Sequence, residues 1–389
     1  MSSTSRRSFL GAGLAAPALA SVRPEARALP QARGPAQEYK FTYGTLGKTG
    51  LRVTRMAFGC MTTSDPSVIE RAADMGINFF DTARVYQGGN NERMVGAALR
   101  KYRDKVYIAS KTKAEDRKAA LADLETSLRE LQTDHLDVWY LHSRSSPSMV
   151  NEEVLEAQRI AKRDGKIRFA GVSFHDGHRE MIPAMMKLNH FDVFLISYNF
   201  TMDAWIEPLI EQARKANIGM VAMKGLAGGV RPTVSVYKVP ADRLNRLNRA
   251  GAAVAAIKWV LKNPYIDTII PSIVDNDQLE ENIRAMAAPF TEADARLLAA
   301  RLEEIRPYYC RMCGNCKGVC PKGMPVSDVL RFLMYAEGYG QFGLGRENYQ
   351  SLPAEVRSIR CAECGSCAVQ CPNGVRVAER LMRAQEVFG

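Results

Sequence analysis

The 389-residue chain lacks an apolar run long enough to cross a bilayer. The weakly apolar stretch 11–20 near the N-terminus falls short of the roughly 20 residues that a membrane-spanning helix needs. The chain also lacks a long basic run and any interleaving of basic with aromatic residues, although its formal net charge is +11. These absences argue against a transmembrane span in the mature chain and against a nucleic-acid partner.

The sequence also has few cysteines outside one repeated pattern, and it lacks a glycine-rich nucleotide-binding motif. Eight of the nine cysteines fall in two copies of one pattern, which leaves only Cys60. No intramolecular disulfide is therefore expected, even in an oxidising compartment. No G-x-G-x-x-G follows an expected strand, so the sequence offers no Rossmann-type nucleotide motif.

The repeated cysteine pattern is C-x2-C-x2-C-x3-C-P, and both copies lie near the C-terminus. Three thiolates at this spacing can surround one face of a cubane cluster, and in two-cluster ferredoxins the fourth cysteine binds the other cluster. Zinc sites usually show paired C-x2-C knuckles without a third cysteine and a trailing Cys-Pro. The spacing predicts two [4Fe-4S] clusters, with Cys310, Cys313, Cys316 and Cys371 on one and Cys361, Cys364, Cys367 and Cys320 on the other.

The N-terminus reads Ser-Arg-Arg-Ser-Phe-Leu over residues 5–10, directly before the weakly apolar stretch. This resembles a twin-arginine export signal. Small-residue cleavage sites follow at 18–20 and 26–28. We expect a signal peptide over 1–28, a linker over 29–40, and a folded protein exported to the periplasm or another extracytoplasmic space. An uncleaved signal that tethers the protein is the alternative.

Residues 41–306 alternate short apolar, β-branched runs with amphipathic stretches. Eight strands, each followed by a helix, predict an α/β (β/α)8 TIM barrel. Residues 307–389 are expected to form a small α-helical ferredoxin-like domain, with a helix over 327–337. A long loop is expected over 225–250. The expected barrel strands are 53–58, 78–81, 106–110, 138–141, 169–173, 193–197, 219–222 and 268–271.

Polar side chains stand at or just after the ends of three successive expected strands, where TIM barrels place their active sites. These residues are Asp81, Tyr86, Lys111 and His142. Alone, each has an ordinary structural explanation, such as a cap, a loop anchor or a solvated end. Together they suit proton donation to a carbonyl oxygen. We expect the Lys111 cation to lower the pKa of Tyr86, Asp81 to hold Lys111, and His142 to orient the substrate.

Three polar residues follow the fifth expected strand on the same rim, namely His175, Asp176 and His178. They are interpreted as loop or capping residues. Metal or substrate binding is the alternative.

Several longer motifs carry a family resemblance. They are Tyr-Gly-Thr-Leu-Gly-Lys-Thr-Gly-Leu at 43–51, Gly-Ile-Asn-Phe-Phe-Asp-Thr-Ala-x-x-Tyr at 76–86, Asn-Glu-Arg-x-x-Gly-x-Ala-Leu at 91–99, Asp-x-x-x-Leu-His at 137–142 and Gly-Val-Ser at 171–173. They resemble the aldo/keto reductase family over roughly 41–306. The resemblance implies an oxidoreductase that interconverts a carbonyl and an alcohol. Its catalytic tetrad would be Asp81, Tyr86, Lys111 and His142, with Tyr86 as the acid and a nicotinamide as the hydride donor.

The resemblance also implies a cofactor site, formed by Ser173, Tyr198, Asn199, Met223, Lys224, Glu281 and Asn282. The site departs from the family pattern in places. Phe174 follows Ser173 where the family has asparagine, Leu195 replaces a glutamine, and Met223 replaces a stacking aromatic residue. Gln278 stands where the family often has an arginine, which leaves NADP and NAD both open. A flavin inside the barrel is a further alternative.

The expected partners are a small carbonyl or alcohol substrate and an electron-transfer protein. Hydride transfer moves two electrons together, whereas iron–sulfur clusters pass them singly. The alternative function is an electron-transfer or binding module whose barrel no longer turns over a nicotinamide-dependent reaction.

Overall fold

The computed structural model describes residues 39–228 and 251–389. The predicted signal peptide, nearly all of the predicted linker and most of the predicted 225–250 loop lie outside these residues. The predictions made for them stay predictions.

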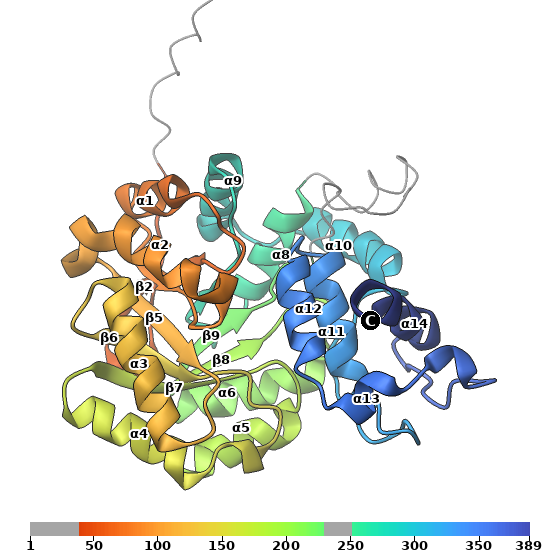
Figure 1. Ribbon diagram of the computed structural model, residues 1–389. Helices are drawn as coiled ribbons and strands as arrows, with labels where there is room; N and C mark the ends of the chain where they lie inside the picture. The colour runs from red at the N-terminus through yellow and green to blue at the C-terminus, as the bar shows by residue number, and fades with distance from the viewer. Residues whose placement is uncertain (1–38, 229–250) are drawn as a thin grey trace, which may run out of the picture. The chain divides into compact units, whose positions relative to one another are not determined.

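Eight parallel strands form the centre of the N-terminal part of the structure (Figure 1). Each strand pairs with the next one along the chain, from β3 to β10. Isolated parallel bridges, Met56 with Ile269 and Gly59 with Ser272, join the first strand region to the last. The strands are β3 (Phe58–Gly59), β4 (Phe79–Asp81), β5 (Tyr107–Thr112), β6 (Leu136–Leu141), β7 (Ile167–Phe174), β8 (Val193–Ser197), β9 (Gly219–Met223) and β10 (Thr268–Ile269).

The junction of the first and last strands depends on a glycine. A Cβ atom at Gly59 would lie 2.7 Å from the carbonyl oxygen of Ile270. No real side chain approaches a backbone oxygen so closely, so only glycine lets the strands meet here. The sheet closes as the predicted barrel, and the fold class is confirmed.

The first expected strand, 53–58, is wrong in its first half. Val53 belongs to an antiparallel hairpin, β1 (Tyr43–Thr45) with β2 (Arg52–Thr54). The chain then bends at Arg55, whose guanidinium donates to three backbone carbonyls within residues 261–266. The barrel strand begins only after this bend, at Phe58. Apolar periodicity could not separate the two strands because they are almost contiguous.

Helices surround the sheet (Figure 1). They are α1 (Pro66–Met75), α2 (Asn90–Leu99), α3 (Arg117–Leu131), α4 (Glu152–Arg163), α5 (His178–Lys187), α6 (Glu207–Lys215), α8 (Ala252–Leu261), α9 (Asn276–Ala287) and α10 (Glu292–Ile305). Several begin at a side chain that caps a free backbone N–H, as Asp116 does for α3. At the start of α10, Thr291 and Asp294 form a reciprocal capping box.

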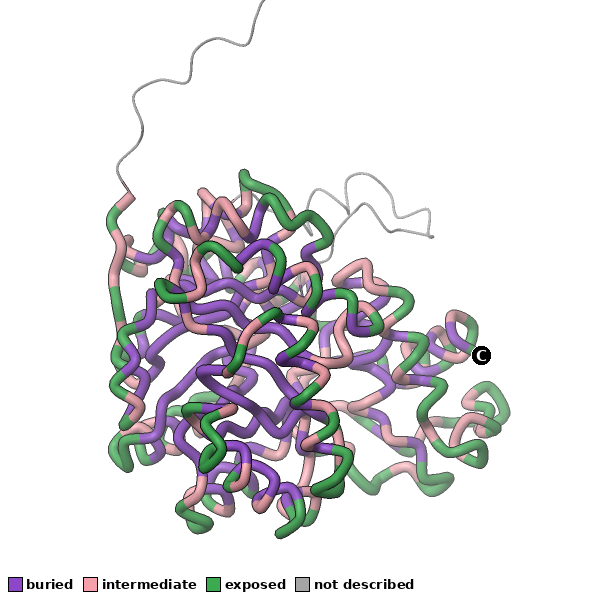
Figure 2. The backbone as a smooth tube through the Cα atoms, turned by 60° about the vertical axis from the view of Figure 1, so that its left-hand side comes forward, coloured by how far each residue is buried: buried purple, intermediate pink, exposed green. Residues whose placement is uncertain are grey.

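The barrel has two apolar layers because strand side chains alternate between its faces. In β6, Val138 and Tyr140 lie in the inner layer, whereas Trp139 and Leu141 pack in the layer shared with the helices. The strands are accordingly buried on both sides, as the purple centre of Figure 2 shows. Polar residues lie at the ends of these otherwise apolar strands.

The C-terminal part is helical, with a core of its own. Its helices are α11 (Val326–Glu337), α12 (Phe342–Gln350), α13 (Ala354–Ser358) and α14 (Val377–Phe388). The expected helix over 327–337 coincides with α11. The core also takes in Ala227, from the residues that follow β9, and packs against Phe200. The C-terminal helices are therefore joined to the barrel by shared packing.

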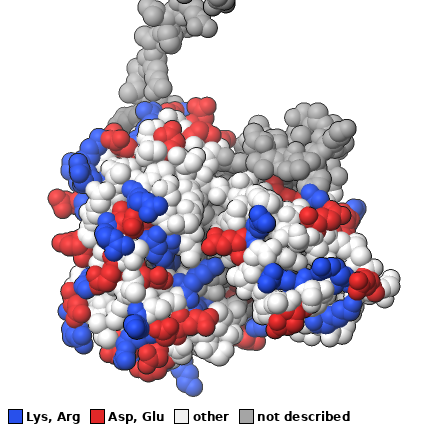
Figure 3. All heavy atoms as spheres, viewed as in Figure 1, with Lys and Arg blue, Asp and Glu red and all other residues white. Residues whose placement is uncertain are grey.

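Positive and negative side chains are interspersed over the face shown in Figure 3. Within residues 39–228 and 251–389, no helix combines the length and the hydropathy that crossing a bilayer would require.

Candidate active site and cluster ligands

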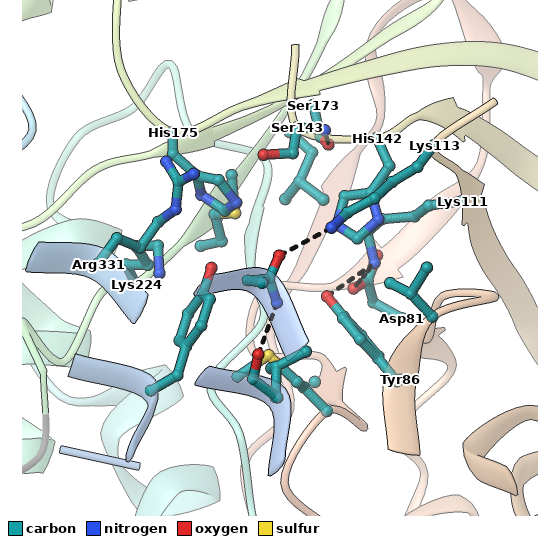
Figure 4. Close-up of a pocket in the computed structure, with 18 of the residues that line it drawn as sticks. Asp81, Tyr86, Lys111, Lys113, His142, Ser143, Ser173, His175, Lys224 and Arg331 are labelled. Carbon is teal, nitrogen blue, oxygen red and sulfur yellow. Dashed lines mark hydrogen bonds and ion pairs between the residues drawn. The ribbon is translucent and has the colours of Figure 1, made fainter. Parts of the chain in front are cut away.

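A cavity of about 420 Å³ lies at the carboxyl ends of the strands, and all four predicted catalytic side chains line it (Figure 4). Asp81 ends β4, and Tyr86 lies in the short helical turn that follows. Lys111 lies near the end of β5, and His142 directly follows β6. Parallel strands that end on one rim thus bring together residues that are up to 61 positions apart in the sequence.

Lys111 is the central charge of this group. Its Nζ atom donates to a carboxylate oxygen of Asp81 and, over 2.6 Å, to the carbonyl oxygen of Thr82. Both charged side chains are almost fully buried. Nζ also lies 3.5 Å from Tyr86 Oη and 5.0 Å from the centre of the Tyr86 ring. The second carboxylate oxygen of Asp81 has no hydrogen-bond partner among the described residues.

The expectation that Lys111 lowers the pKa of Tyr86 is wrong for this pocket. Burial raises the pKa of Tyr86 well above its usual value, and the nearby Asp81 carboxylate raises it further. The physical reason is that Asp81 balances the charge of Lys111 while also facing Tyr86. Tyr86 therefore holds its proton firmly. Burial likewise raises the pKa of Asp81, and Lys111 opposes that rise.

His142 faces Tyr86 edge-on, with the ring centres 5.8 Å apart. Burial lowers the pKa of His142 well below its usual value, and the Lys111 and Lys113 cations lower it further. The imidazole is therefore neutral. Its Nδ1 atom is buried and has no hydrogen-bond partner in the part of the chain that the structure describes. A neutral ring with a free polar atom suits hydrogen bonding to a substrate oxygen.

Three of the seven predicted cofactor residues, Ser173, Met223 and Lys224, line the cavity. Glu281 and Asn282 lie in α9 and are not part of the cavity lining. The cavity thus offers groups that fit a nicotinamide ring, but not the whole predicted dinucleotide site.

The other two predicted cofactor residues, Tyr198 and Asn199, have different partners. The hydroxyl of Tyr198 donates to Glu207 and accepts from Asn263, and its ring packs on Trp259. Asn199 donates to the carbonyl of Lys224 and to the hydroxyl of Tyr309, each over 3.1 Å. Neither side chain lines the cavity.

The C-terminal helices supply residues to the same cavity, which the sequence did not predict. Those that line it from α11, α12 and the residues between and after them are Asp328, Arg331, Phe332, Tyr335, Tyr339, Leu344, Asn348 and Ser351. The one available signal is Arg331, a charged residue inside the almost continuous apolar run of α11. His175, interpreted as a loop residue, also lines the cavity.

The eight cysteines of the two sequence repeats lie in two spatial groups. Burial raises the pKa of Cys310, and the neighbours that raise it further are Cys316, Cys313 and Cys371. The corresponding neighbours of Cys361 are Cys364, Cys320 and Cys367. Each group thus holds three cysteines of one copy and the fourth of the other. The assignment of these groups as cluster ligands stays a prediction.

The cysteine environment fits a cluster better than a single metal ion. No three His, Cys, Asp or Glu side chains in the described residues converge as ligands of one ion do. In a cubane, each thiolate binds its own iron atom, so the sulfurs stay apart. Donors also face the sulfurs: Asn373 Nδ2 lies 3.4 Å from Cys313 Sγ, and the backbone N of Met312 lies 3.4 Å from Cys310 Sγ. Hydrogen bonds of this kind tune cluster potentials.

Comparison with known proteins agrees with a parallel barrel that carries a redox site. The model of the aldo/keto reductase family matches residues 62–303, and that of the 4Fe-4S dicluster domain matches residues 309–378. The chain belongs to the aldo/keto reductase family. It is an oxidoreductase with a C-terminal iron–sulfur dicluster domain, and NAD(P) dependence is typical of the family.

The relatives match the barrel rather than the whole chain. The uncharacterized oxidoreductase YqkF of Bacillus subtilis is 25% identical, over 67% of this chain and 96% of its own length. L-glyceraldehyde 3-phosphate reductase of Escherichia coli K12 is 24% identical, over 65% of this chain and 89% of its own.

Solved structures show the same coverage. Aldo-keto reductase AKR11C1 from Bacillus halodurans, in its holo form, shares the fold with a TM-score of 0.56 at 24% identity, over 67% of this chain and 96% of its own. The thermostable aldo-keto reductase Tm1743, in complex with the inhibitor epalrestat, has a TM-score of 0.53 at 26% identity, over 67% of this chain and 99% of its own.

The crossed grouping of the cysteines makes a prediction. Protein purified without oxygen should contain about eight iron and eight sulfide per chain. Cys371→Ser should perturb the same cluster as Cys310→Ser and leave the other intact, because the two residues share a group. Iron analysis and electron paramagnetic resonance of the dithionite-reduced protein measure this.

Cys60→Ala is the matched control, since Cys60 is buried in the barrel and lies outside both groups. It should keep both clusters. If Cys371→Ser instead perturbs the cluster that Cys361→Ser perturbs, the crossed assignment is wrong.

Proposed function

We propose that the protein interconverts a carbonyl and an alcohol in the barrel cavity, and that its two [4Fe-4S] clusters exchange electrons with a redox partner. The observation that carries the proposal is the buried Lys111–Asp81 ion pair beside Tyr86 in the cavity that His142 also lines. A structural ion pair would not need a phenol and a neutral imidazole facing the same space. The family of the barrel supports this chemistry.

In the proposed reduction, Tyr86 donates its phenolic proton to the substrate oxygen. A raised pKa still allows this transfer, because the developing alkoxide is a stronger base than a phenolate. His142 donates a hydrogen bond to the same oxygen and orients the carbonyl. Lys111 stabilises the phenolate that forms, and Asp81 keeps Lys111 in place.

A nicotinamide, when bound, supplies the hydride that reduces the carbonyl carbon. Ser173 and Met223 are the residues that would hold it, because they line the cavity. Met223 offers a polarisable thioether surface to a ring where the family pattern has an aromatic residue.

The clusters are proposed to act as an electron wire rather than as structural staples alone. Tyr309 directly precedes Cys310 and bonds to Asn199 at the barrel, so the first cysteine group is anchored to the strand ends. A partner protein would then exchange electrons one at a time.

We also propose export by the twin-arginine route, supported by the Arg6-Arg7 motif. Replacing Arg6 and Arg7 together with lysine should leave the protein in the cytoplasm with its clusters intact, as measured by fractionation and iron content. The pair Arg23→Lys and Arg33→Lys, outside the motif and outside both candidate cleavage sites, is the control and should not change export. Equal export of both double variants would sink the proposal.

The proposed acid is tested by Tyr86→Phe. The variant should lose about 10²- to 10⁴-fold in kcat with little change in KM, because only the proton donor is removed. Reduction of 4-nitrobenzaldehyde with NADPH, and then with NADH, measures the loss. Tyr43→Phe is the control, since Tyr43 is exposed and does not line the cavity. Activity that survives in Tyr86→Phe would favour the electron-transfer or binding module.

The pKa directions predict the pH dependence. His142 stays neutral above its lowered pKa, and Tyr86 stays protonated below its raised pKa. For reduction, kcat/KM should therefore be flat from about pH 7 to about pH 9, whereas alcohol oxidation, which needs the deprotonated Tyr86, should rise throughout that range. A reduction rate that falls with a midpoint near pH 7 would mean that Tyr86 is tuned in a way this pocket does not explain.

A further inference from the structure

The C-terminal domain contributes a guanidinium group to the barrel cavity. Arg331 of α11 lines it together with Lys113, which follows β5, and Lys224, which follows β9. Figure 4 shows Arg331, Lys224 and His175 grouped on one side, with Lys113 nearer to Tyr86 and His142. Basic side chains from three separate elements, one of them outside the barrel, thus line the same cavity.

Carboxylates lie near most of these cations, but only some of them form ion pairs among the described residues. Asp81 forms an ion pair with Lys111, and Asp328 forms one with Arg331 over 2.6 Å. Among the described residues, Lys113 bonds to the amide oxygen of Asn348, over 2.9 Å, and to no carboxylate. The remaining carboxylates close enough to interact are Asp176 with Arg331, Glu347 with Lys113 and Glu115 with Arg144.

Lys224 is the second lysine without a carboxylate partner, and burial, followed by repulsion from Arg331, lowers its pKa well below the usual value. Its Nζ atom lies 4.8 Å and 5.4 Å from the ring centres of Tyr335 and Tyr339. These rings attract an ammonium group but do not neutralise its charge. Lys113 and Lys224 thus have no ion-pair partner within residues 39–228 and 251–389.

Two histidines that line the cavity carry buried polar atoms without partners among the described residues. The Nδ1 atoms of His142 and His175 are both buried and have no hydrogen-bond partner among the described residues. Both histidines are more than nine-tenths buried. A buried polar atom without a partner destabilises a protein unless a ligand satisfies it. Burial, followed by repulsion from Lys224 and Arg331, lowers the pKa of His175.

We propose that this cavity binds an anionic substrate, and that Arg331, Lys113 and Lys224 hold its charged group while Tyr86 and His142 face its carbonyl. The inference rests on the proposed function and names its substrate class: a carbonyl compound or alcohol that bears a carboxylate or a phosphate. Arg331 is then a specificity residue supplied by the dicluster domain. Its planar guanidinium suits both anions.

Direct binding to the cluster-loaded full chain tests this, by isothermal titration calorimetry without oxygen. The probes are D-glucuronate, D-glucose 6-phosphate and uncharged D-glucose, which share a ring and differ in charge. At least one acid should bind about 10- to 100-fold more tightly than glucose, the range expected for a charge-assisted hydrogen bond. Equal binding of all three, or binding of neither acid, would overturn the proposal.

Arg331→Gln and Lys113→Gln should each remove most of the preference for the acid. Arg331→Lys should keep more of it than Arg331→Gln, which separates charge from packing. Lys113→Gln guards against misfolding of the Arg331 variants, because Lys113 lies at the cavity edge and packs in no core. Lys118→Gln, at an exposed position on α3, is the matched control and should change nothing.

A nucleotide phosphate is the other source of an anion. Titration of the same variants with NADPH separates the two. If Arg331→Gln weakens NADPH binding tenfold and leaves the preference for the acid unchanged, the cations serve the nucleotide and the proposal fails. Binding is measured without turnover, and the preference for the acid compares ligands that share the same ring. Loss of reduction in Tyr86→Phe therefore stays distinguishable from failure of the anion site.

Discussion

The site depends on one buried ammonium group. Lys111 and Asp81 are 1% and 2% exposed, in a medium where an unpaired charge costs several kcal/mol. Asp81 and the carbonyl of Thr82 make this charge tolerable, and together they fix Nζ beneath Tyr86. That position follows from the parallel pairing of β4 and β5, whose ends deliver a carboxylate and an ammonium to the same rim. The rest of the cavity is arranged around this pair.

The same ion pair explains why the cavity holds its acid and its imidazole in neutral forms. Because the pair is close to neutral overall, burial dominates at Tyr86, which keeps its proton. Burial lowers the pKa of His142, and the nearby Lys111 and Lys113 cations lower it further, so the ring does not take up a proton. Two neutral donors facing one space suit a polarised carbonyl better than two charged groups would, since neither has to be desolvated when the substrate arrives.

Sequence reasoning predicted the residues whose positions follow from local rules. Strand alternation and the convergence of strand ends were enough to place Asp81, Lys111 and His142 on one rim. Tyr198 was predicted as a cofactor residue without regard to this alternation. It has the parity of Phe194 and Ile196, which face the helices, and its ring indeed packs on Trp259. Arg331 was not predicted, because its place depends on how α11 packs against the barrel. Its position within an apolar run marks it as unusual but does not encode that contact.

The packing of α11 against the barrel bears on whether electrons can pass between the cavity and the clusters. Tyr309 joins the first cysteine group to Asn199, and Tyr335 and Tyr339 lie against Lys224, a residue of the cavity. The cluster domain therefore meets the barrel at the strand ends, where the chemistry is proposed, and not at the opposite end. A domain that only stabilised the barrel could pack anywhere on its surface. Meeting it at this rim shortens the path between the cavity and the clusters. A carrier that divides a hydride pair into single electrons would still have to link the two.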